Sequence, residues 1–324
     1  MLANYIEAFK NIRTDVNRHR WAAITKYRAP YKPFLLFTIF DLISQGEIKS
    51  NLIELTPEFC ETFTLYWARI MPPERKSNIA MPFFYLMSDG FWHLVPYPGK
   101  ERELQTIIER NIPLTTVNQI NEVAIGAKLD DELFNLIQVK ENRDLLRSIL
   151  IENYFAPAAK PVLLEQSQIN DEAYRYSLEL LNEKYGIKPV PEEIKSVARS
   201  QGFRIAIVKT YSHRCTTCGI KILTSDGHTI VEAAHIIPFS ISRNDDPRNG
   251  LCLCRSCHWG FDEGLISVSA KYEVITSPQL TTNSNLPSYI VTLTGRGIIY
   301  PVEEKFLPDL DNLAWHRKEV FRIR

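Results

Sequence analysis

Four of the six cysteines in the 324-residue sequence form two C-x-x-C pairs, Cys215 with Cys218 and Cys254 with Cys257. Each pair puts two thiolates on one tight turn, and two such turns can complete a tetrahedral four-sulfur site. This spacing favours a metal over disulfide bonds, and over the alternative of small buried apolar side chains. We therefore predict a structural zinc ion (Zn²⁺) at these four residues. Cys252 breaks the pairing, and we expect it in the core of a strand rather than as a fifth ligand.

Three further polar residues, His235, Asn249 and His258, lie between and beside these pairs. Residues 229–239 are predicted to form a strand with His235 near its end, followed by a loop. Asn249 precedes a short apolar strand, and His258 begins a helix directly after the second cysteine pair. A single histidine is most often a packed or surface residue. A strand–strand–helix unit fixed by zinc, however, could bring the two histidines to face each other across a small cleft.

The segments EAAHIIPFS, NGLCLC and CHWGFDEGL resemble the HNH endonucleases, whose ββα-metal motif has zinc-clipped members, and in particular the branch of predicted bacterial restriction endonucleases. His235, Asn249 and His258 fall at the three positions that give the family its name. The resemblance implies that His235 is the general base for the attacking water, since imidazole titrates near neutral pH. It implies that His258 holds one divalent ion, Mg²⁺ or Mn²⁺, at the scissile phosphate. Asn249 would hold the His235 loop in place rather than touch the substrate.

The sequence departs from this family at one position. Many members carry an acidic metal ligand directly before the base histidine, where this chain has Ala234. Glu232 lies two residues earlier and would project on the same face of a strand. We hypothesise that Glu232 supplies the missing carboxylate, directly or through water. The alternative is a glutamate with no catalytic role.

The resemblance extends to the N-terminal half. The segments RAPYKPFLLFTIFDLI, LTPEFCETFTLYW and MPFFYLMSDGFWHLVP are similar to a domain that accompanies HNH nucleases in modification-dependent restriction enzymes, and whose relatives bind phosphorothioate DNA. Pro82 matches the aromatic–proline pair that these relatives present to the modified backbone, whereas Met81 does not. Arg28, Tyr31 and Lys32 are candidates for the surrounding wall and charge, or else ordinary turn and helix-start residues.

Charge is unevenly distributed. The chain has 38 basic and 38 acidic residues in total, which excludes a broadly basic nucleic-acid coat. Residues 10–32 nevertheless carry seven basic side chains against one acid, Asp15. This stretch is either a solvated helix face with a loop or a surface that contacts DNA phosphates. The basic residues are Lys10, Arg13, Arg18, Arg20, Lys26, Arg28 and Lys32.

Hydrophobic spacing predicts an α+β fold. We expect helices over residues 3–18 and 33–44, a helix capped by Thr56 with Pro57 at its first position, and helix over residues 128–154. Residues 83–87 and 91–95 are predicted to form a hairpin, which makes the N-terminal domain mixed helical and winged-helix-like. Towards the C-terminus we expect strands in VSAKYEVI and SYIVTLTG, and a last helix in DNLAWHRKEVFR with His316 at the surface or in a cap.

These observations predict three parts: a DNA- or modification-recognition domain over residues 1–155, a linker with one helix over 156–195, and a zinc-clipped ββα-metal (HNH) nuclease domain over 196–324. An apolar content of 45% with 23% charged residues is that of an ordinary globular protein. The apolar stretch at 33–43 is too short to cross a bilayer, which takes about 20 residues. With no export signal in MLANYIEAFK, we expect a cytoplasmic protein.

The function that follows is a modification-dependent DNA endonuclease that acts as a homodimer on double-stranded DNA, with phosphorothioate as the leading mark. One alternative is a non-catalytic zinc-containing DNA-binding or regulatory protein, in which Ala234 marks a lost activity. Another is a nuclease directed at RNA. All three residues His235, Asn249 and His258 are present, which favours a working nuclease over a degenerate one.

Overall fold

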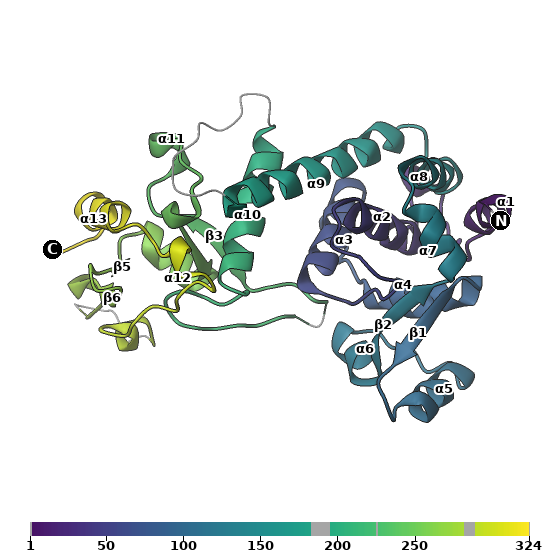
Figure 1. Cartoon of the computed structure of the whole chain (residues 1–324), viewed down its shortest axis with the longest axis horizontal. Coiled ribbons are helices and arrows are strands. Elements are labelled where there is room, and N and C mark those ends of the chain that lie inside the picture. The colour runs from purple at the N-terminus through teal and green to yellow at the C-terminus, as the bar shows by residue number, and fades with distance from the viewer. Residues whose placement is uncertain (1, 183–194, 225, 282–288, 324) are drawn as a thin grey trace. The chain divides into compact units, whose positions relative to one another are not determined.

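The protein is described here from a computed structural model that covers residues 2–182, 195–224, 226–281 and 289–323. It is a mixed α and β protein in which helices predominate, as expected (Figure 1). The chain divides into two compact units. The first unit is Met1–Asp171 with Leu223–His228, and the second unit is Glu172–Ile222 with Thr229–Arg324. No described helix is both long enough and apolar enough to cross a membrane.

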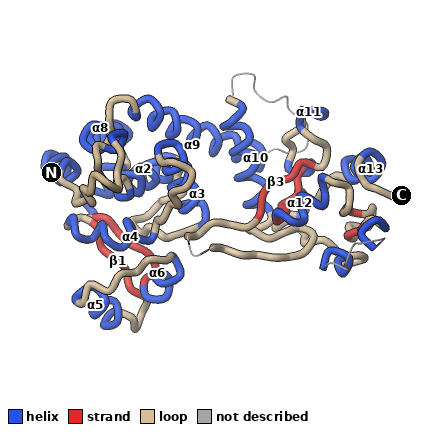
Figure 2. The backbone as a smooth tube through the Cα atoms, turned by 180° about the vertical axis from the view of Figure 1, so that it is seen from behind, coloured by secondary structure: helices blue, strands red, loops and turns tan. Residues whose placement is uncertain are grey.

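The first unit is mainly helical around one aromatic core (Figure 2). Helix α2 is apolar on all sides and is buried from Lys32 to Ile43, so it forms the centre of this core. Two strands, β1 and β2, pair in antiparallel register with Trp92 opposite Leu129. The elements of this unit are α1 (Leu2–Lys10), α2 (Tyr31–Ser44), α3 (Pro57–Ile70), α4 (Ala80–Tyr85), β1 (Trp92–Pro96), α5 (Glu101–Glu109), α6 (Val117–Val123), β2 (Ala124–Leu129), α7 (Asp131–Ile137), α8 (Lys140–Tyr154) and the first part of α9 (Ala159–Asn182).

The helix starts predicted from capping residues are confirmed. The Thr56 hydroxyl accepts a hydrogen bond from the Phe59 amide at 3.2 Å, and Pro57 is the first residue of α3. Helix α2 begins two residues before its predicted start and is followed by Gly46 in the left-handed conformation, with φ 74°. The predicted first helix is shorter than expected, because α1 ends at Lys10.

The predicted hairpin at residues 83–95 is wrong. Its first half is helical, in α4 and a 3₁₀ turn over Leu86–Asp89, and only β1 is a strand. Pro82 lies in the first turn of α4, where its missing N–H group removes no helical hydrogen bond. A short apolar run gives no clear periodicity, so sequence alone could not separate helix from strand here. The winged-helix description depended on this hairpin, and these elements do not support it.

A buried carboxylate ties α9 into the first unit. The Asp41 side chain on α2 is 3% exposed and accepts hydrogen bonds from Tyr66 (2.6 Å), Arg147 (2.8 Å), Ser167 (2.8 Å) and Asn170 (2.8 Å). These donors come from α3, α8 and α9. Because each oxygen is hydrogen-bonded and the charge is paired with an arginine, the buried ion is compensated.

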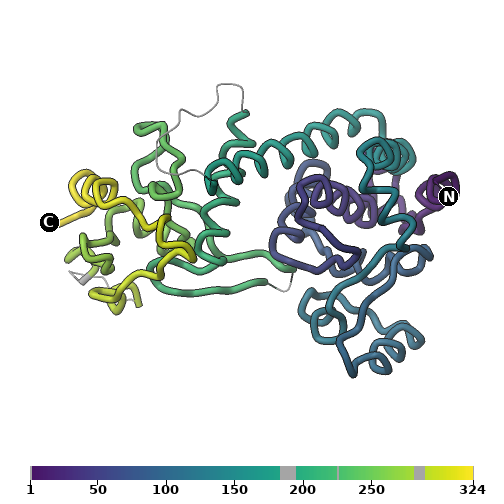
Figure 3. Tube along the Cα trace, in the orientation of Figure 1, coloured from purple at the N-terminus to yellow at the C-terminus, as the bar shows by residue number. Residues whose placement is uncertain are grey.

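The second unit has a smaller core that α10, β3, β4 and α12 share. Its trace runs from teal through green to yellow in Figure 3. Strands β3 and β4 are antiparallel, with Val231 opposite Cys254 and His235 opposite Gly250. The predicted linker contains α9, and its residues 183–194 lie outside the described part. The elements of this unit are the rest of α9, α10 (Ser196–Thr210), β3 (Val231–His235), α11 (Phe239–Ser242), β4 (Gly250–Cys254), α12 (Arg255–Asp262), β5 (Ile266–Val268), β6 (Val274–Thr276) and α13 (Leu310–Glu319).

The C-terminal predictions are confirmed in part. The predicted strand VSAKYEVI is wrong over most of its length, because residues 269–273 connect β5 to β6 in a turn. The predicted last helix appears as α13. The second predicted strand is wrong, because Tyr289–Leu293 form a 3₁₀ helix. His316 is also not at the surface: it is 1% exposed, and its ring stacks on Phe261 at 3.6 Å. Its Nε2 lies 3.1 Å from the Phe261 carbonyl and its Nδ1 lies 2.9 Å from the Ser267 hydroxyl, so it joins α12, α13 and β5.

Candidate nuclease site

The four paired cysteines converge as predicted. Their Sγ atoms all lie within 4.8 Å of one another, and those of Cys218 and Cys254 are 3.8 Å apart. Tetrahedral zinc with Zn–S bonds of about 2.3 Å requires sulfur atoms about 3.8 Å apart, so the thiols fit this ion. Hydrogen bonds from the neighbouring thiols, that of Cys218 first, hold the pKa of Cys215 well below its ordinary value, which favours the thiolate. Cys252 lies buried in β4 outside this cluster, as expected.

Two short segments hold the thiols in place. The first is a tight turn in which the Gly219 amide donates to the Cys215 carbonyl at 2.9 Å, and Gly219 has φ 75°. The second is the junction of β4 and α12, with Cys254 at the end of the strand and Cys257 on the helix. The Thr216 amide donates to the Cys252 carbonyl at 2.7 Å, which joins the turn to β4. A metal ion bound to the four thiols would therefore fix the position of α12 relative to β4.

His235 is the last residue of β3, and its side chain is 20% exposed. One face of the imidazole stacks on the Phe203 ring of α10, with centroids 3.9 Å apart and planes 7° apart. Gly250 lies opposite on β4, where a Cβ atom would come within 2.4 Å of Ile207. Glycine at this position lets α10 pack closely enough to support the ring.

Asn249 is fully buried and holds the loop that follows His235. Its side-chain nitrogen donates to the carbonyls of Ile237 and Asn244, both at 3.0 Å. Its side-chain oxygen accepts from the Ile237 amide at 2.9 Å. The structure therefore places Asn249 against the backbone of the loop that follows His235.

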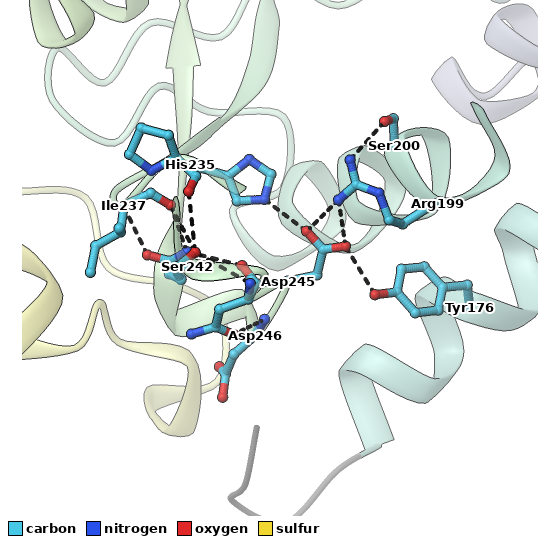
Figure 4. A network of polar contacts seen from close by, with 11 residues as sticks. Tyr176, Arg199, Ser200, His235, Ile237, Ser242, Asp245 and Asp246 are labelled. Atoms are coloured by element: carbon cyan, nitrogen blue, oxygen red, sulfur yellow. Dashed lines mark hydrogen bonds and ion pairs between the residues drawn. The ribbon is translucent and has the colours of Figure 1, made fainter. Parts of the chain in front are cut away.

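Sequence reasoning missed the residue that contacts the His235 ring. The Asp245 carboxylate is 1% exposed and lies 2.8 Å from Nε2 of His235. Figure 4 shows it between that ring on one side and Arg199 and Tyr176 on the other. Burial would raise the pKa of Asp245, but hydrogen bonds from His235 and Arg199 outweigh it and hold the pKa below its ordinary value. The only signal in the sequence was an acidic residue in the loop between the two histidines.

His258 lies on α12 between two carboxylates. Its Nδ1 is 3.3 Å from Glu232, and its Nε2 is 3.4 Å from Asp262 one helical turn later. Imidazole and carboxylate oxygen together suit Mg²⁺ or Mn²⁺. Because the carboxylates face opposite nitrogens of one ring, an ion bound to His258 could share only one of them in this conformation. Among the described residues, the four cysteines are the group in which three or more potential ligand atoms already lie close together.

Glu232 and Ala234 lie in different environments on β3. Its side chain is 39% exposed and lies 3.2 Å from Nε of Arg255, while Ala234 is 1% exposed and points into the core. Asp262 was not anticipated, although its spacing of four residues from His258 places the two on one helix face.

The DNA-binding candidates of the first unit do not form one exposed surface. Lys32 is 8% exposed, its ammonium group lies 2.6 Å from Asp89, and burial lowers its pKa. Pro82 is also buried, and Met81 is half-buried. Lys32 and Pro82 are therefore packed within this unit. Tyr31 is half-buried and stacks on Trp67 at 4.6 Å, which leaves Arg28 as the exposed candidate.

The rest of the basic stretch stays accessible. Apart from Lys32, its basic side chains are all exposed. Arg18 and Arg28 lie over the rings of Tyr27 and Tyr154 at 5.2 and 5.9 Å, contacts that leave their N–H groups available. The exposed basic residues are Lys10, Arg13, Arg18, Arg20, Lys26 and Arg28.

One segment of this chain matches a known protein family. A comparison with curated proteins found no match. A solved structure described as "Modification dependent TagI restriction endonuclease" is 26% identical over 37% of this chain and 38% of its own, with a TM-score of 0.28. Residues 215–269 match the family described as HNH endonuclease. The matched residues include the cysteine cluster, His235, Asn249 and His258.

Proposed function

We propose that this protein is a metal-dependent DNA endonuclease of the restriction type. The observation that carries the proposal is the placement of His235 and His258 on adjoining elements of one ββα unit, β3 and α12, within the segment that matches the HNH family. Asn249 supports the loop between them, and the cysteine cluster anchors the helix.

In this proposal His235 accepts the proton of the attacking water at Nδ1, because Nε2 is engaged by Asp245. His258 and one neighbouring carboxylate, Glu232 or Asp262, would hold Mg²⁺ or Mn²⁺. The bound ion supplies charge stabilisation for the phosphate and for the leaving 3′ oxygen. Asn249 keeps the His235 loop at a fixed position and does not touch the substrate.

The first unit is proposed as the reader of a DNA modification, with phosphorothioate as the leading mark. The exposed cations of residues 10–28 would contact the DNA backbone, since phosphate contacts supply most of non-specific affinity. Cleavage of both strands by a single-metal site needs two copies, so a homodimer on DNA is part of the proposal. If the mass of the protein–DNA complex corresponded to one copy of the chain on DNA cut in both strands, the homodimer proposal would be contradicted.

The test is cleavage of unmodified, phosphorothioated and methylcytosine-containing duplexes with Mg²⁺ or Mn²⁺. His235→Ala is expected to abolish cutting, while His93→Ala, at an exposed histidine paired with Asp130, is expected to retain it. Cutting of one modified duplex alone would identify the mark. DNA binding without cutting of any duplex would instead support the non-catalytic alternative. Comparing cleavage of a matched RNA duplex with that of the DNA duplex tests whether the substrate is RNA or DNA.

A further inference from the structure

The Asp245 carboxylate is held by donors on three sides, and only one of them is a residue of the HNH pattern. Its Oδ1 lies 2.8 Å from Nε2 of His235 and 2.9 Å from Nη1 of Arg199. Its Oδ2 lies 2.8 Å from the same Arg199 nitrogen and 2.9 Å from the Tyr176 hydroxyl. We infer that Asp245 is a positioning residue that fixes which nitrogen of His235 acts as the base, and that Arg199 and Tyr176 hold Asp245 in place. This inference rests on the proposed function.

The tautomer follows from the donors and acceptors. An ionised carboxylate can only accept hydrogen bonds, and a buried one beside an arginine stays ionised. Nε2 of His235 must therefore carry the proton that it donates to Asp245. The lone pair of the neutral ring is then on Nδ1, which is the nitrogen left for the water.

The surrounding rings restrict rotation of both partners. Phe203 covers one face of the His235 ring, and Phe239 lies 6.1 Å from it on α11. The Arg199 guanidinium lies 3.5 Å above the Phe239 ring while it binds Asp245. A ring that turned over would lose its bond to Asp245, so the packing and the carboxylate select one orientation.

The carboxylate also stabilises the product of proton transfer. When His235 takes a proton from water, the imidazolium lies directly against Asp245, as in dyads in which an aspartate orients a catalytic histidine. Arg199 keeps the carboxylate ionised before that step, so the network needs no rearrangement during it. Tyr176 adds one neutral hydrogen bond from α9.

Nitrogen-15 NMR of histidine in the full chain, without DNA, tests the tautomer directly. The His235 signals are identified by their loss in His235→Gln, and we expect a protonated Nε2 and an unprotonated Nδ1. In Asp245→Asn, the amide group cannot accept on both sides, and the Nδ1–H tautomer should appear. Asp246→Asn is the matched control: the neighbouring aspartate binds Arg248 and not His235, so the wild-type signals should remain. An Nδ1–H ring in the wild type, or unchanged signals in Asp245→Asn, would overturn the inference.

Kinetics give the second readout. We expect Asp245→Asn to lower kcat about 100-fold or more with KM for DNA within about threefold, because orientation acts on the chemical step. Tyr176→Phe removes one neutral bond and should lower kcat only severalfold, and Asp246→Asn should leave kcat unchanged. A tautomer shift with wild-type kcat would contradict the positioning role. If the wild-type protein cuts no duplex, the proposed nuclease function fails, whereas the NMR result still decides the Asp245–His235 geometry.

Discussion

Two histidines of the second unit differ in the charge of the atoms that their rings contact. His316 faces a backbone carbonyl and a serine hydroxyl, and neither group is charged. His235 faces the ionised carboxylate of Asp245. The environment of His316 therefore favours a neutral structural ring, whereas the ring of His235 is hydrogen-bonded to a carboxylate.

The neutral ring gives a pH-dependent contribution to stability. Burial lowers the pKa of His316 from 6.5 to about 4 in the folded state. Its contribution is complete above the unfolded pKa, decreases as the pH falls below 6.5, and is lost as the pH passes through about 4. Between pH 7 and pH 5 this amounts to about 2 kcal/mol.

Hydrogen exchange of the α13 amides measures this effect. Protection should fall between pH 7 and pH 5 in the wild-type chain after correction for intrinsic exchange rates. In His316→Gln, protection should be lower at pH 7 and should change less with pH. The same pH dependence in both proteins would show that another group is responsible.

A second prediction separates the two carboxylates beside His258. We predict that Glu232→Gln weakens Mn²⁺ binding to the zinc-loaded protein about tenfold or more, while Asp262→Asn changes it less than about threefold. Arg255→Ala should tighten binding, because Arg255 competes for Glu232. Electron paramagnetic resonance of Mn²⁺ measures all three affinities. The reverse order for the two carboxylate variants would assign the ion to Asp262 and to the Nε2 side of His258.

Among the elements, the junction of β4 and α12 depends most on the metal. We predict about one zinc per chain, loss of that zinc in Cys254→Ser, and retention in Cys252→Ser, whose thiol lies outside the cluster. Structural zinc contributes on the order of 10 kcal/mol to folding, so the Cys254 variant should expose the second unit to protease. Metal analysis and limited proteolysis test this, and zinc at wild-type content in Cys254→Ser would contradict it.

Two glycines have similar backbone conformations but different surroundings. Substituting each by alanine distinguishes the cost of backbone strain from the cost of steric overlap. Gly264 and Gly295 have φ 68° and 76°. A Cβ atom at Gly264 would lie 2.1 Å from the Val320 carbonyl oxygen after α13, whereas at Gly295 it would meet nothing within 4 Å. We predict that Gly295→Ala costs about 1 kcal/mol and Gly264→Ala about 3 kcal/mol or more. Equal losses in denaturant unfolding would show that α13 moves away freely.

Features encoded by local spacing could be predicted from the sequence. The cysteine pairs, the Thr56–Pro57 helix start and the order of His235, Asn249 and His258 all belong to this class. Asp245 could be noticed, but its donors Arg199 and Tyr176 lie 46 and 69 residues away, so no local pattern connects them. The hairpin prediction failed because Pro82 and its apolar neighbours suit a short helix as well as a strand.

For the whole molecule, DNA affinity should depend on the exposed cations of the first unit. We predict that Arg18→Ala with Arg28→Ala lowers the slope of log affinity against log salt by about 2 on unmodified duplex, one unit for each lost phosphate contact. Lys140→Ala with Lys160→Ala is the control, because these lysines are paired with Asp144 and Glu152. Equal slopes in both double variants would place the DNA elsewhere.

Helix α9 limits where this protein can exchange parts with others during evolution. It supplies Ser167 and Asn170 to the buried Asp41 of the first unit and Tyr176 to the buried Asp245 of the second. A recombination joint between Asp41 and Asn170 would separate Asp41 from donors on α9, and a joint between Tyr176 and Asp245 would separate those two residues. Either joint would leave a buried carboxylate short of a hydrogen bond. Viable chimeras that join the C-terminal part of this chain to a foreign N-terminal unit should therefore have their joint between Asn170 and Tyr176.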